Sequence, residues 1–436
     1  MNIPEQGRDA ADVLAELDAR HTGDTDWRGG RVFSLVYHAS EAHEHLLHEA
    51  HAKYASANLL NPMAFKSLKR METEIVEMVG RLFHCAGAVG AVTSGGTESI
   101  LCAVAAYRDR ARKKWPWIRR PQLVVPTTIH PAFDKAAHYF GVELVKVPVG
   151  ADFRADVPAM ARAIGRRTIG LVASAPQYPH GVVDPIGELG ELAQRKRLPL
   201  HVDACVGGFV LPWLERLGRN IPFWDFRVPG VTSISADLHK YGYAANGASL
   251  LLWRSMDDMR HQIFVATDFP GGIYASPTLL GTRPGGPVAA AWAALQTLGA
   301  SGYLELARAA IDAADALRAG IARIPGLTVI HGDATIVAYQ GENLYAVADR
   351  LEARGWSCDR QHRPASIHLT VTANHAPIVD RYLADLREAV AEVRANPALA
   401  KTGSAPMYGM AAKLPVRFLV ASQVRKVIAG LYGGPQ

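Results

Sequence analysis

Ser233-Ile-Ser-Ala-Asp-Leu-His-Lys-Tyr-Gly242 ends an apolar run that is typical of a buried strand. It carries a single lysine, Lys240, between His239 and Tyr241. A lysine amine becomes a useful nucleophile when its pKa falls or when a carbonyl partner awaits it, and a Schiff base with a cofactor aldehyde meets the second condition. Taken alone, however, a lysine that follows a strand is usually a solvent-exposed residue at the end of that strand, with no catalytic role.

An acidic residue occupies a corresponding place in an earlier apolar run. His201-Val-Asp-Ala-Cys-Val-Gly-Gly208 puts Asp203 where a strand is expected to end. A carboxylate at that place could pair with a pyridinium nitrogen, although an aspartate on an apolar strand is more often a cap or a member of an ion pair. Cys205 is predicted to be a small buried residue, because no base lies near it in the sequence.

A glycine-rich turn supplies a third element. Ser94-Gly-Gly-Thr-Glu-Ser99 lies between an apolar run and an Ala-rich segment that is predicted to be a helix. The N–H groups of Gly95, Gly96 and Thr97 and the helix N-terminus could hold a phosphate. A phosphate turn, an acid for a ring nitrogen and a Schiff-base lysine, in this order and each at a strand end, are what a pyridoxal 5′-phosphate (PLP) enzyme requires. The sequence therefore predicts PLP as the cofactor.

The alternation of strand and helix patterns predicts an α/β fold. From Ala88 to Trp253, apolar β-branched runs alternate with helical segments, which predicts a mostly parallel sheet with helices on both faces. Strand ends then gather at one edge, where ligands bind. A long Ala/Leu-rich helix follows and leads into a smaller α+β region. We predict an N-terminal arm (1–60), a large PLP-binding domain (61–286) and a small C-terminal domain (287–436).

The composition is that of a globular protein and excludes several other classes. With 436 residues and 49% hydrophobic content, the chain can bury a large core, and its 20% charged content is ordinary. The net charge of +6 comes from dispersed residues apart from the run Arg110–Lys114, so no nucleic-acid surface is predicted. No run predicts a membrane span or signal peptide, and the four cysteines show no C-x-x-C spacing. We expect a cytoplasmic protein.

A histidine-rich segment raises the question of a metal site. His45, His48 and His51 follow helical spacing within Val36–Lys53. The segment has no H-E-x-x-H spacing, and neither a cysteine nor a further carboxylate ligand is evident. An exposed helix face is therefore the favoured interpretation, and no metal is predicted.

Seven motifs occur along the chain in the order TSGGTESI, PQYPHGVVDP, LPLHVDACVGGF, DFRVPGVTSISADLHKYGYA, GGIYASPTLLGTRPGG, ASIHLTV and MYGMA. Together they resemble the sphingosine-1-phosphate lyases, within the PLP-dependent group II decarboxylase-like family. The resemblance extends from about Arg31 to Leu431, and the absence of a membrane anchor looks like the bacterial form. It implies a fold-type-I PLP enzyme of sphingolipid metabolism that cleaves a lipid-like β-hydroxy amine to an aldehyde and a small amine by a retro-aldol reaction.

The resemblance also implies roles for residues around the cofactor. Lys240 would hold PLP as a Schiff base, and Asp203 would keep the pyridine nitrogen protonated. His130, just past a predicted strand, matches the family histidine that stacks on the cofactor ring, although a histidine there could also simply cap the next helix. His239 matches a family position near the cofactor phosphate.

Further positions belong to the substrate side and to a predicted homodimer with a shared active site. Tyr37 matches a substrate-side tyrosine of the family, and Tyr178 stands in the PQYPHG loop beside the expected cleft. A phenol can donate to an alkoxide or a phosphate, but tyrosines are also common packing residues. The resemblance implies that the loop Gly271–Pro277 crosses the dimer interface, where Ser276 would add to the neighbouring subunit's phosphate site.

Two departures from the family pattern concern the phosphate of the substrate. The lyase motif continues as H-K-Y-G-Y-A-P-K-G, whereas Asn246 replaces the second lysine here. The family segment N-P-L-H-P-D reads Asn61-Pro-Met-Ala-Phe-Lys66, so Met63 and Ala64 replace the histidine. Charge-assisted contacts are each worth about 1.5–3 kcal/mol, so phosphate binding would weaken unless another cation such as Lys66 substitutes.

Two other functions compete with the lyase interpretation. An amino-acid decarboxylase on the same scaffold would release carbon dioxide instead of an aldehyde. A catalytically idle PLP-binding or scaffold protein is disfavoured, because Lys240, Asp203 and His130 are all present. The chain length of the substrate, and whether it carries a phosphate, stay open at this point.

Overall fold

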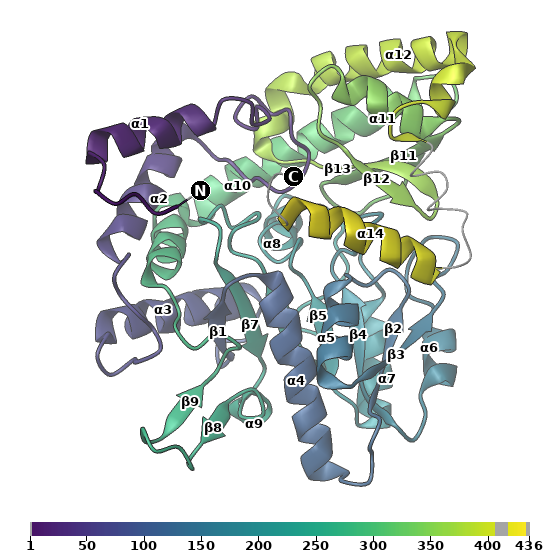
Figure 1. Ribbon diagram of the computed structural model, residues 1–436. Coiled ribbons are helices and arrows are strands. Elements are labelled where there is room, and N and C mark those ends of the chain that lie inside the picture. Colours follow the sequence, from purple (N-terminus) through teal and green to yellow (C-terminus); the bar gives the residue numbers. More distant parts are fainter. Residues whose placement is uncertain (1, 406–416, 433–436) are drawn as a thin grey trace.

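A seven-stranded sheet forms the centre of the computed structural model, which describes residues 2–405 and 417–432 (Figure 1). The MYGMA motif lies outside these residues. The strand order is β1-β7-β6-β5-β4-β2-β3, and every neighbouring pair is parallel except the two that β7 makes. The strands are β1 (Val89–Thr93), β2 (Gln122–Pro126), β3 (Glu143–Val147), β4 (Thr168–Ser174), β5 (Leu200–Asp203), β6 (Val231–Ala236) and β7 (Ser249–Trp253). The prediction of a mostly parallel sheet is confirmed.

Helices cover both faces of this sheet because successive strand residues point to opposite sides. On β2, Val124 packs into one apolar core, whereas Leu123 and Val125 pack into the other. Helices α4 and α5 lie over the second core, and α3, α7 and α8 over the first. The helix α3 (Lys66–Leu82) precedes the first strand, and the helices that follow strands are α4 (Gly96–Lys114), α5 (Ala132–Phe140), α6 (Val157–Ala163), α7 (Ile186–Lys196), α8 (Leu211–Arg216) and α9 (Met256–Met259).

The C-terminal part contains a second, antiparallel sheet of order β10-β11-β13-β12. It comprises β10 (Leu327–Ile330), β11 (Ile336–Gly341), β12 (Asp359–His362) and β13 (Ala365–Thr370), with α11 (Leu344–Glu352), η1 (Ala373–Ile378), α12 (Val379–Ala395), η2 (Pro397–Lys401) and α14 (Arg417–Tyr432). The helix α10 (Gly285–Ala322) leads into this sheet and is interrupted at Gly299, which has non-helical backbone angles. The sequence did not predict β12, because its residues are polar and it lies at the edge of the sheet.

The N-terminal segment contains α1 (Ala10–Arg20) and α2 (Glu41–Lys53), and the stretch between these two helices is held against the small sheet. The N–H of Phe33 donates to the carbonyl of Ser357, and the N–H of Thr370 donates to the carbonyl of Phe33. The Phe33 ring stacks on His375 with 4.4 Å between the ring centroids. These contacts fix the chain just before Tyr37 and so carry that residue to the edge of the large sheet. The division at residues 60 and 286 stays a prediction.

A two-stranded hairpin of β8 (Phe264–Ala266) and β9 (Tyr274–Ser276) projects from the body of the protein at the bottom of Figure 1. The sequence did not predict these two short strands. Within the described residues, no helix combines the length and the apolar composition that a membrane span needs. The four cysteines are free thiols.

Candidate active site

Lys240 lies just beyond the carboxyl end of β6, in the turn that the sequence singled out. Its Nζ is 2.9 Å from Oδ2 of Asp237, which is buried and also accepts a 2.6 Å hydrogen bond from the hydroxyl of Ser249. Burial disfavours the Lys240 ammonium, but the Asp237 carboxylate outweighs this and raises the pKa of Lys240. The ammonium in turn holds the pKa of Asp237 below its usual range, against the effect of burial. Asp237 is thus the direct partner of the lysine.

The glycine-rich turn packs against the same carboxylate. Helix α4 begins at Gly96, where a Cβ atom would lie 2.7 Å from Oδ1 of Asp237 and 2.8 Å from Sγ of Cys205. Only glycine therefore allows the helix to begin this close to the lysine. Glu98 holds the turn, because its carboxylate accepts hydrogen bonds from the N–H groups of Ser94, at 2.6 Å, and of Leu279, at 2.9 Å. The first N–H groups of a helix lack intrahelical acceptors and favour an anion.

Asp203 ends β5 and is fixed by a buried network of hydrogen bonds. Its Oδ1 accepts from the N–H of Cys205 at 3.1 Å and from the hydroxyl of Ser235 at 3.2 Å. Ser235 also contacts Nε2 of His201 at 3.2 Å, and Nδ1 of His201 contacts the hydroxyl of Ser233 at 2.8 Å. Burial lowers the pKa of His201 to about 4, so this ring is neutral at physiological pH.

Sequence reasoning missed His201, Ser233 and Ser235, although a signal was present. The two serines alternate along β6, and the sheet register pairs Ser233 with His201 and Ser235 with Asp203. Polar residues at every second position of two neighbouring buried strands lie on one face and can satisfy one another. Such an alternation beside a candidate acid is the pattern to look for.

Two adjoining cavities of about 290 and 460 Å³ bring most of the predicted site residues together. The residues common to both are His130, Cys205, His239, Lys240 and Asn246. The smaller cavity is also lined by Asp203, Tyr37 and Tyr178, and the larger one by Gly95, Gly96 and Thr97. The glycine-rich turn, Lys240 and the buried carboxylate of Asp203 thus line the same pair of adjoining cavities.

His130, His239 and Cys205, which line both cavities, differ in their contacts with the rest of the protein. Nδ1 of His130 accepts a hydrogen bond from the N–H of Ala132 at 3.2 Å, so the side chain caps α5 and also lines both cavities. His239 Nδ1 contacts the carbonyl of Ala248 at 2.9 Å. Burial raises the pKa of the Cys205 thiol well above its ordinary value, which agrees with a packing role.

Ser276 is the predicted site residue that the single chain does not bring to the cavities. It is buried, and its hydroxyl donates to the carbonyls of Thr278 at 3.0 Å and of Leu280 at 3.1 Å. Met63, Ala64 and Lys66 are exposed and lie outside the linings of both cavities. Among the described residues, no cluster of histidine, cysteine and carboxylate side chains could hold a metal ion.

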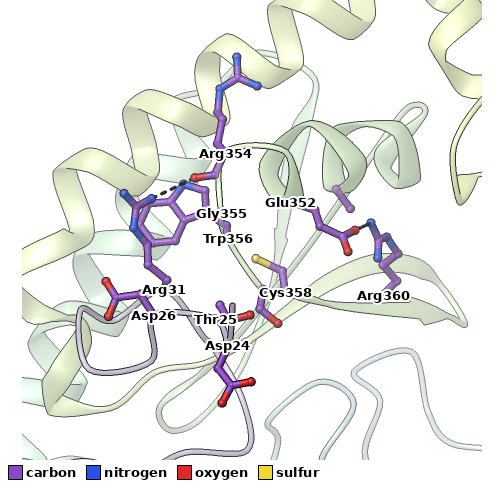
Figure 2. A pocket seen from close by; sticks show the side chains of 12 residues that line it. Asp24, Thr25, Asp26, Arg31, Glu352, Arg354, Gly355, Trp356, Cys358 and Arg360 are labelled. Carbon is purple, nitrogen blue, oxygen red and sulfur yellow. Dashed lines mark hydrogen bonds and ion pairs between the residues drawn. The ribbon is translucent and has the colours of Figure 1, made fainter. Parts of the chain in front are cut away.

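A larger cavity of about 530 Å³ lies between the N-terminal arm and the small sheet (Figure 2). Its cationic side chains already have partners. The guanidinium carbon of Arg31 lies 4.3 Å from the ring centroid of Trp356. The guanidinium of Arg360 forms ion pairs with the carboxylates of Asp349 and Glu352, each with an N–O distance of 2.8 Å. This cavity contains none of the predicted site residues, so it does not compete as the active site.

Comparisons with known proteins agree with this geometry. Residues 19–338 match the family model described as the pyridoxal-dependent decarboxylase conserved domain. The chain is 44% identical over 430 residues to sphingosine-1-phosphate lyase of Arabidopsis thaliana, covering 96% of this chain and 78% of that protein. It is 42% identical to sphingosine-1-phosphate lyase 1 of Mus musculus, covering 96% of this chain and 75% of that protein.

A solved structure agrees as well. The sphingosine-1-phosphate lyase of Burkholderia pseudomallei superposes with a TM-score of 0.87 at 40% identity, covering 92% of this chain and 94% of that one. The chain belongs to the sphingosine-1-phosphate lyase family of PLP-dependent enzymes. Glutamate decarboxylase of Lactobacillus brevis superposes with a TM-score of 0.79 but at 20% identity, so it shares the fold.

The cofactor of this lyase family is PLP, and the residues present fit it. The N-terminus of α4 offers N–H groups to a phosphate, and the absence of a side chain at Gly96 leaves the turn open beside the lysine. Asp203 lines the smaller cavity and offers a buried carboxylate for the ring nitrogen, with its Oδ1 held by the N–H of Cys205 and the hydroxyl of Ser235. Lys240 lines both cavities and offers an amine to the aldehyde.

Proposed function

We propose that this protein is a PLP-dependent carbon–carbon lyase that cleaves a sphingoid-type β-hydroxy amine to a long-chain aldehyde and a small amine. The observation that carries this proposal is that Lys240, Asp203, His130 and the glycine-rich turn line one space together with two phenols, Tyr37 and Tyr178. The relatives with about 40% identity over most of their length have this activity in their names.

The side chains of the site have separate tasks in such a reaction. When bound, PLP supplies the aldehyde for the lysine and accepts the electron pair that the broken carbon–carbon bond releases. In this proposal Asp203 holds a proton at the ring nitrogen, and the Asp237 carboxylate, 2.9 Å from Lys240 Nζ, stabilises positive charge on that nitrogen. Burial raises the pKa of Tyr37 to about 12, so its phenol stays protonated and can donate a hydrogen bond to the substrate.

The reaction type can be tested by the products of one incubation. We expect the PLP-loaded protein to release aldehyde and amine in equal amounts from a sphingoid base phosphate, because a retro-aldol reaction breaks the bond between the amine-bearing carbon and the hydroxyl-bearing carbon. Mass spectrometry would quantify both products. Carbon dioxide from plain amino acids, with no aldehyde from any hydroxy amine, would support the decarboxylase instead.

The cavity linings of the single chain offer few cations to the phosphate group of a substrate. Among the described residues that line the two cavities, Lys240 is the one lysine or arginine. Asn246 lines both cavities, where the family pattern has a second lysine. A phosphate dianion would therefore depend on the neutral side chains of the site, on histidine, or on a second subunit.

We also infer that the protein is a homodimer whose hairpin β8–β9 contacts the partner subunit. The hairpin region exposes several large apolar side chains, among them Phe264 (61%), Phe269 (60%) and Ile273 (79%). A contiguous exposed apolar surface is typical of a protein–protein interface. Glu98 ties the segment after β9 to the phosphate turn, so a contact at the hairpin would reach the cofactor site directly.

The dimer can be tested at the tip of this hairpin. We expect Ile273→Asp to convert the dimer into a monomer and to lower PLP retention, because burying an unpaired carboxylate in an apolar interface costs several kcal/mol. Sedimentation velocity and the cofactor content after dialysis would report both effects. Tyr139→Asp, at a 60% exposed aromatic residue of α5, is the matched control. An unchanged sedimentation coefficient for Ile273→Asp would place the interface elsewhere.

A further inference from the structure

The small C-terminal sheet places a carboxylate against one of the two phenols of the active site. The hydroxyl of Tyr178, in the loop after β4, donates a hydrogen bond to Oδ2 of Asp359, the first residue of β12. These two residues are 181 positions apart in the chain. Because Tyr178 lines the same cavity as Lys240, the carboxylate lies directly behind a wall of the site.

The position of the phenol is fixed by the rest of that wall. The Tyr178 ring packs on His368 with 4.3 Å between the ring centroids. His368 is buried, which lowers its pKa to about 4, and its Nε2 contacts the hydroxyl of Thr370 at 3.0 Å. Gln361 Nε2 donates to the carbonyl of Pro179 at 2.6 Å, so β12 also holds the backbone next to the tyrosine.

The hydrogen bond between Tyr178 and Asp359 determines whether the phenol can donate or accept a hydrogen bond in the cavity. Its proton is directed to Asp359, so the phenol oxygen is left with lone pairs for a donor in the cavity. Burial, together with the neighbouring carboxylate, raises the pKa of Tyr178, so the phenol does not ionise unaided at physiological pH. A phenol in this state can take a proton only if it passes its own proton on, and Asp359 is the group in place to receive it.

We propose that Asp359 is a positioning residue of the lyase reaction, which acts through Tyr178 by accepting its phenol proton while the phenol oxygen takes the proton of the substrate β-hydroxyl. This inference rests on the proposed retro-aldol cleavage. The substrate O–H bond breaks and an O–H bond forms on Tyr178, while the phenol O–H bond breaks and one forms on Asp359. The electron pair of the substrate O–H bond becomes the second bond of the aldehyde C=O, and the pair of the broken carbon–carbon bond stays with the amine-bearing fragment.

The proposal predicts a kinetic effect of Asp359→Asn. The amide can still accept a hydrogen bond from the phenol but is not basic, so we expect kcat to fall about tenfold with KM changed less than about twofold. The absorbance of bound PLP should stay the same, since Asp359 lies outside the linings of both cavities. A loss of packing would instead change KM, cofactor content and thermal stability together.

A double-mutant cycle separates this role from simple anchoring of β12. In a Tyr178→Phe background, Asp359→Asn should have almost no further effect on kcat, because the two residues act as one unit. Tyr345→Phe is the matched control, since the Tyr345 hydroxyl donates to the carbonyl of Gln361 on the same strand at 2.6 Å but does not line the cavity. We expect this control to retain the unmodified kcat. Additive effects of the two variants would overturn the proposal.

A spectroscopic measurement tests the pair without any turnover. With tyrosine labelled with ¹³C at Cζ, the resonance lost in Tyr178→Phe identifies this phenol, and Asp359→Asn should move it toward the position of a phenol without a charged acceptor. An unchanged resonance would refute the pairing. If the unmodified protein releases no aldehyde from any hydroxy amine, the proposed function fails. If the unmodified protein releases aldehyde and the Asp359→Asn variant has the same kcat, the proposed role of Asp359 is wrong while the proposed function stands.

Discussion

Lys240→Ala is expected to give a colourless protein whose lyase activity is lower by at least about 10³-fold, since no other amine of the described cavity linings can hold the cofactor aldehyde. In the unmodified protein, borohydride should attach a pyridoxyl group to Lys240, and peptide mass spectrometry would locate it. The effect should exceed that of any other single substitution in the site, because the proposed reaction assigns to this lysine both the covalent bond to the cofactor and proton transfer at the substrate.

The fold is expected to survive this change. Lys240 is partly exposed at the cavity, and its removal leaves Asp237 with the hydroxyl of Ser249 as a partner. Circular dichroism and the sedimentation coefficient should therefore match those of the unmodified protein. Lys135→Ala, at an exposed lysine of α5, is the control that should stay yellow and active. A reducible cofactor adduct on another lysine of Lys240→Ala would show that the assignment of Lys240 is wrong.

The large sheet was predictable because its signals are local. Buried parallel strands read as continuous apolar runs, and their carboxyl ends meet at one edge, so side chains far apart in the sequence come together. This reasoning predicts that Lys240, Asp203 and the turn around Gly96 lie around one space, which is the arrangement observed. The order of strands, with the antiparallel β7 between β1 and β6, was not predicted, since nothing in the local pattern encodes it.

The parts that were not predicted depend on contacts between distant segments. Strand β12 contains polar residues at a sheet edge, so its apolar pattern is absent, yet it brings Asp359 to Tyr178. The partner of Lys240 was also missed, although Asp237 stands three residues before it in the decisive stretch. In the sequence, an aspartate at that place is typical of an exposed strand end. Only the structure shows that Asp237 is buried and that Gly96 of the glycine-rich turn packs against its carboxylate.

The identity of residue 246 should decide how well the site accepts a phosphorylated head group. Asn246 lines both active-site cavities beside His239, and a neutral amide offsets the desolvation of a dianion only in part. We expect Asn246→Lys to raise kcat/KM for a sphingoid base phosphate by about 10- to 100-fold, because a new charge-assisted hydrogen bond is worth about 1.5–3 kcal/mol. For the unphosphorylated analogue, kcat/KM should change less than about twofold, since no ion pair is gained.

Two further variants test whether the gain requires a charge at residue 246 and whether another cation already supplies it. Asn246→Gln adds length without charge and should leave both substrates unaffected. Lys66→Ala tests the other cation of the altered segment, which is exposed and lies outside the linings of both cavities in the single chain. Suppose that the unmodified protein already cleaves the phosphorylated base efficiently, and that Asn246→Lys leaves this rate unchanged. The lost lysine is then compensated, and a fall in the same rate for Lys66→Ala would identify Lys66 as the replacement.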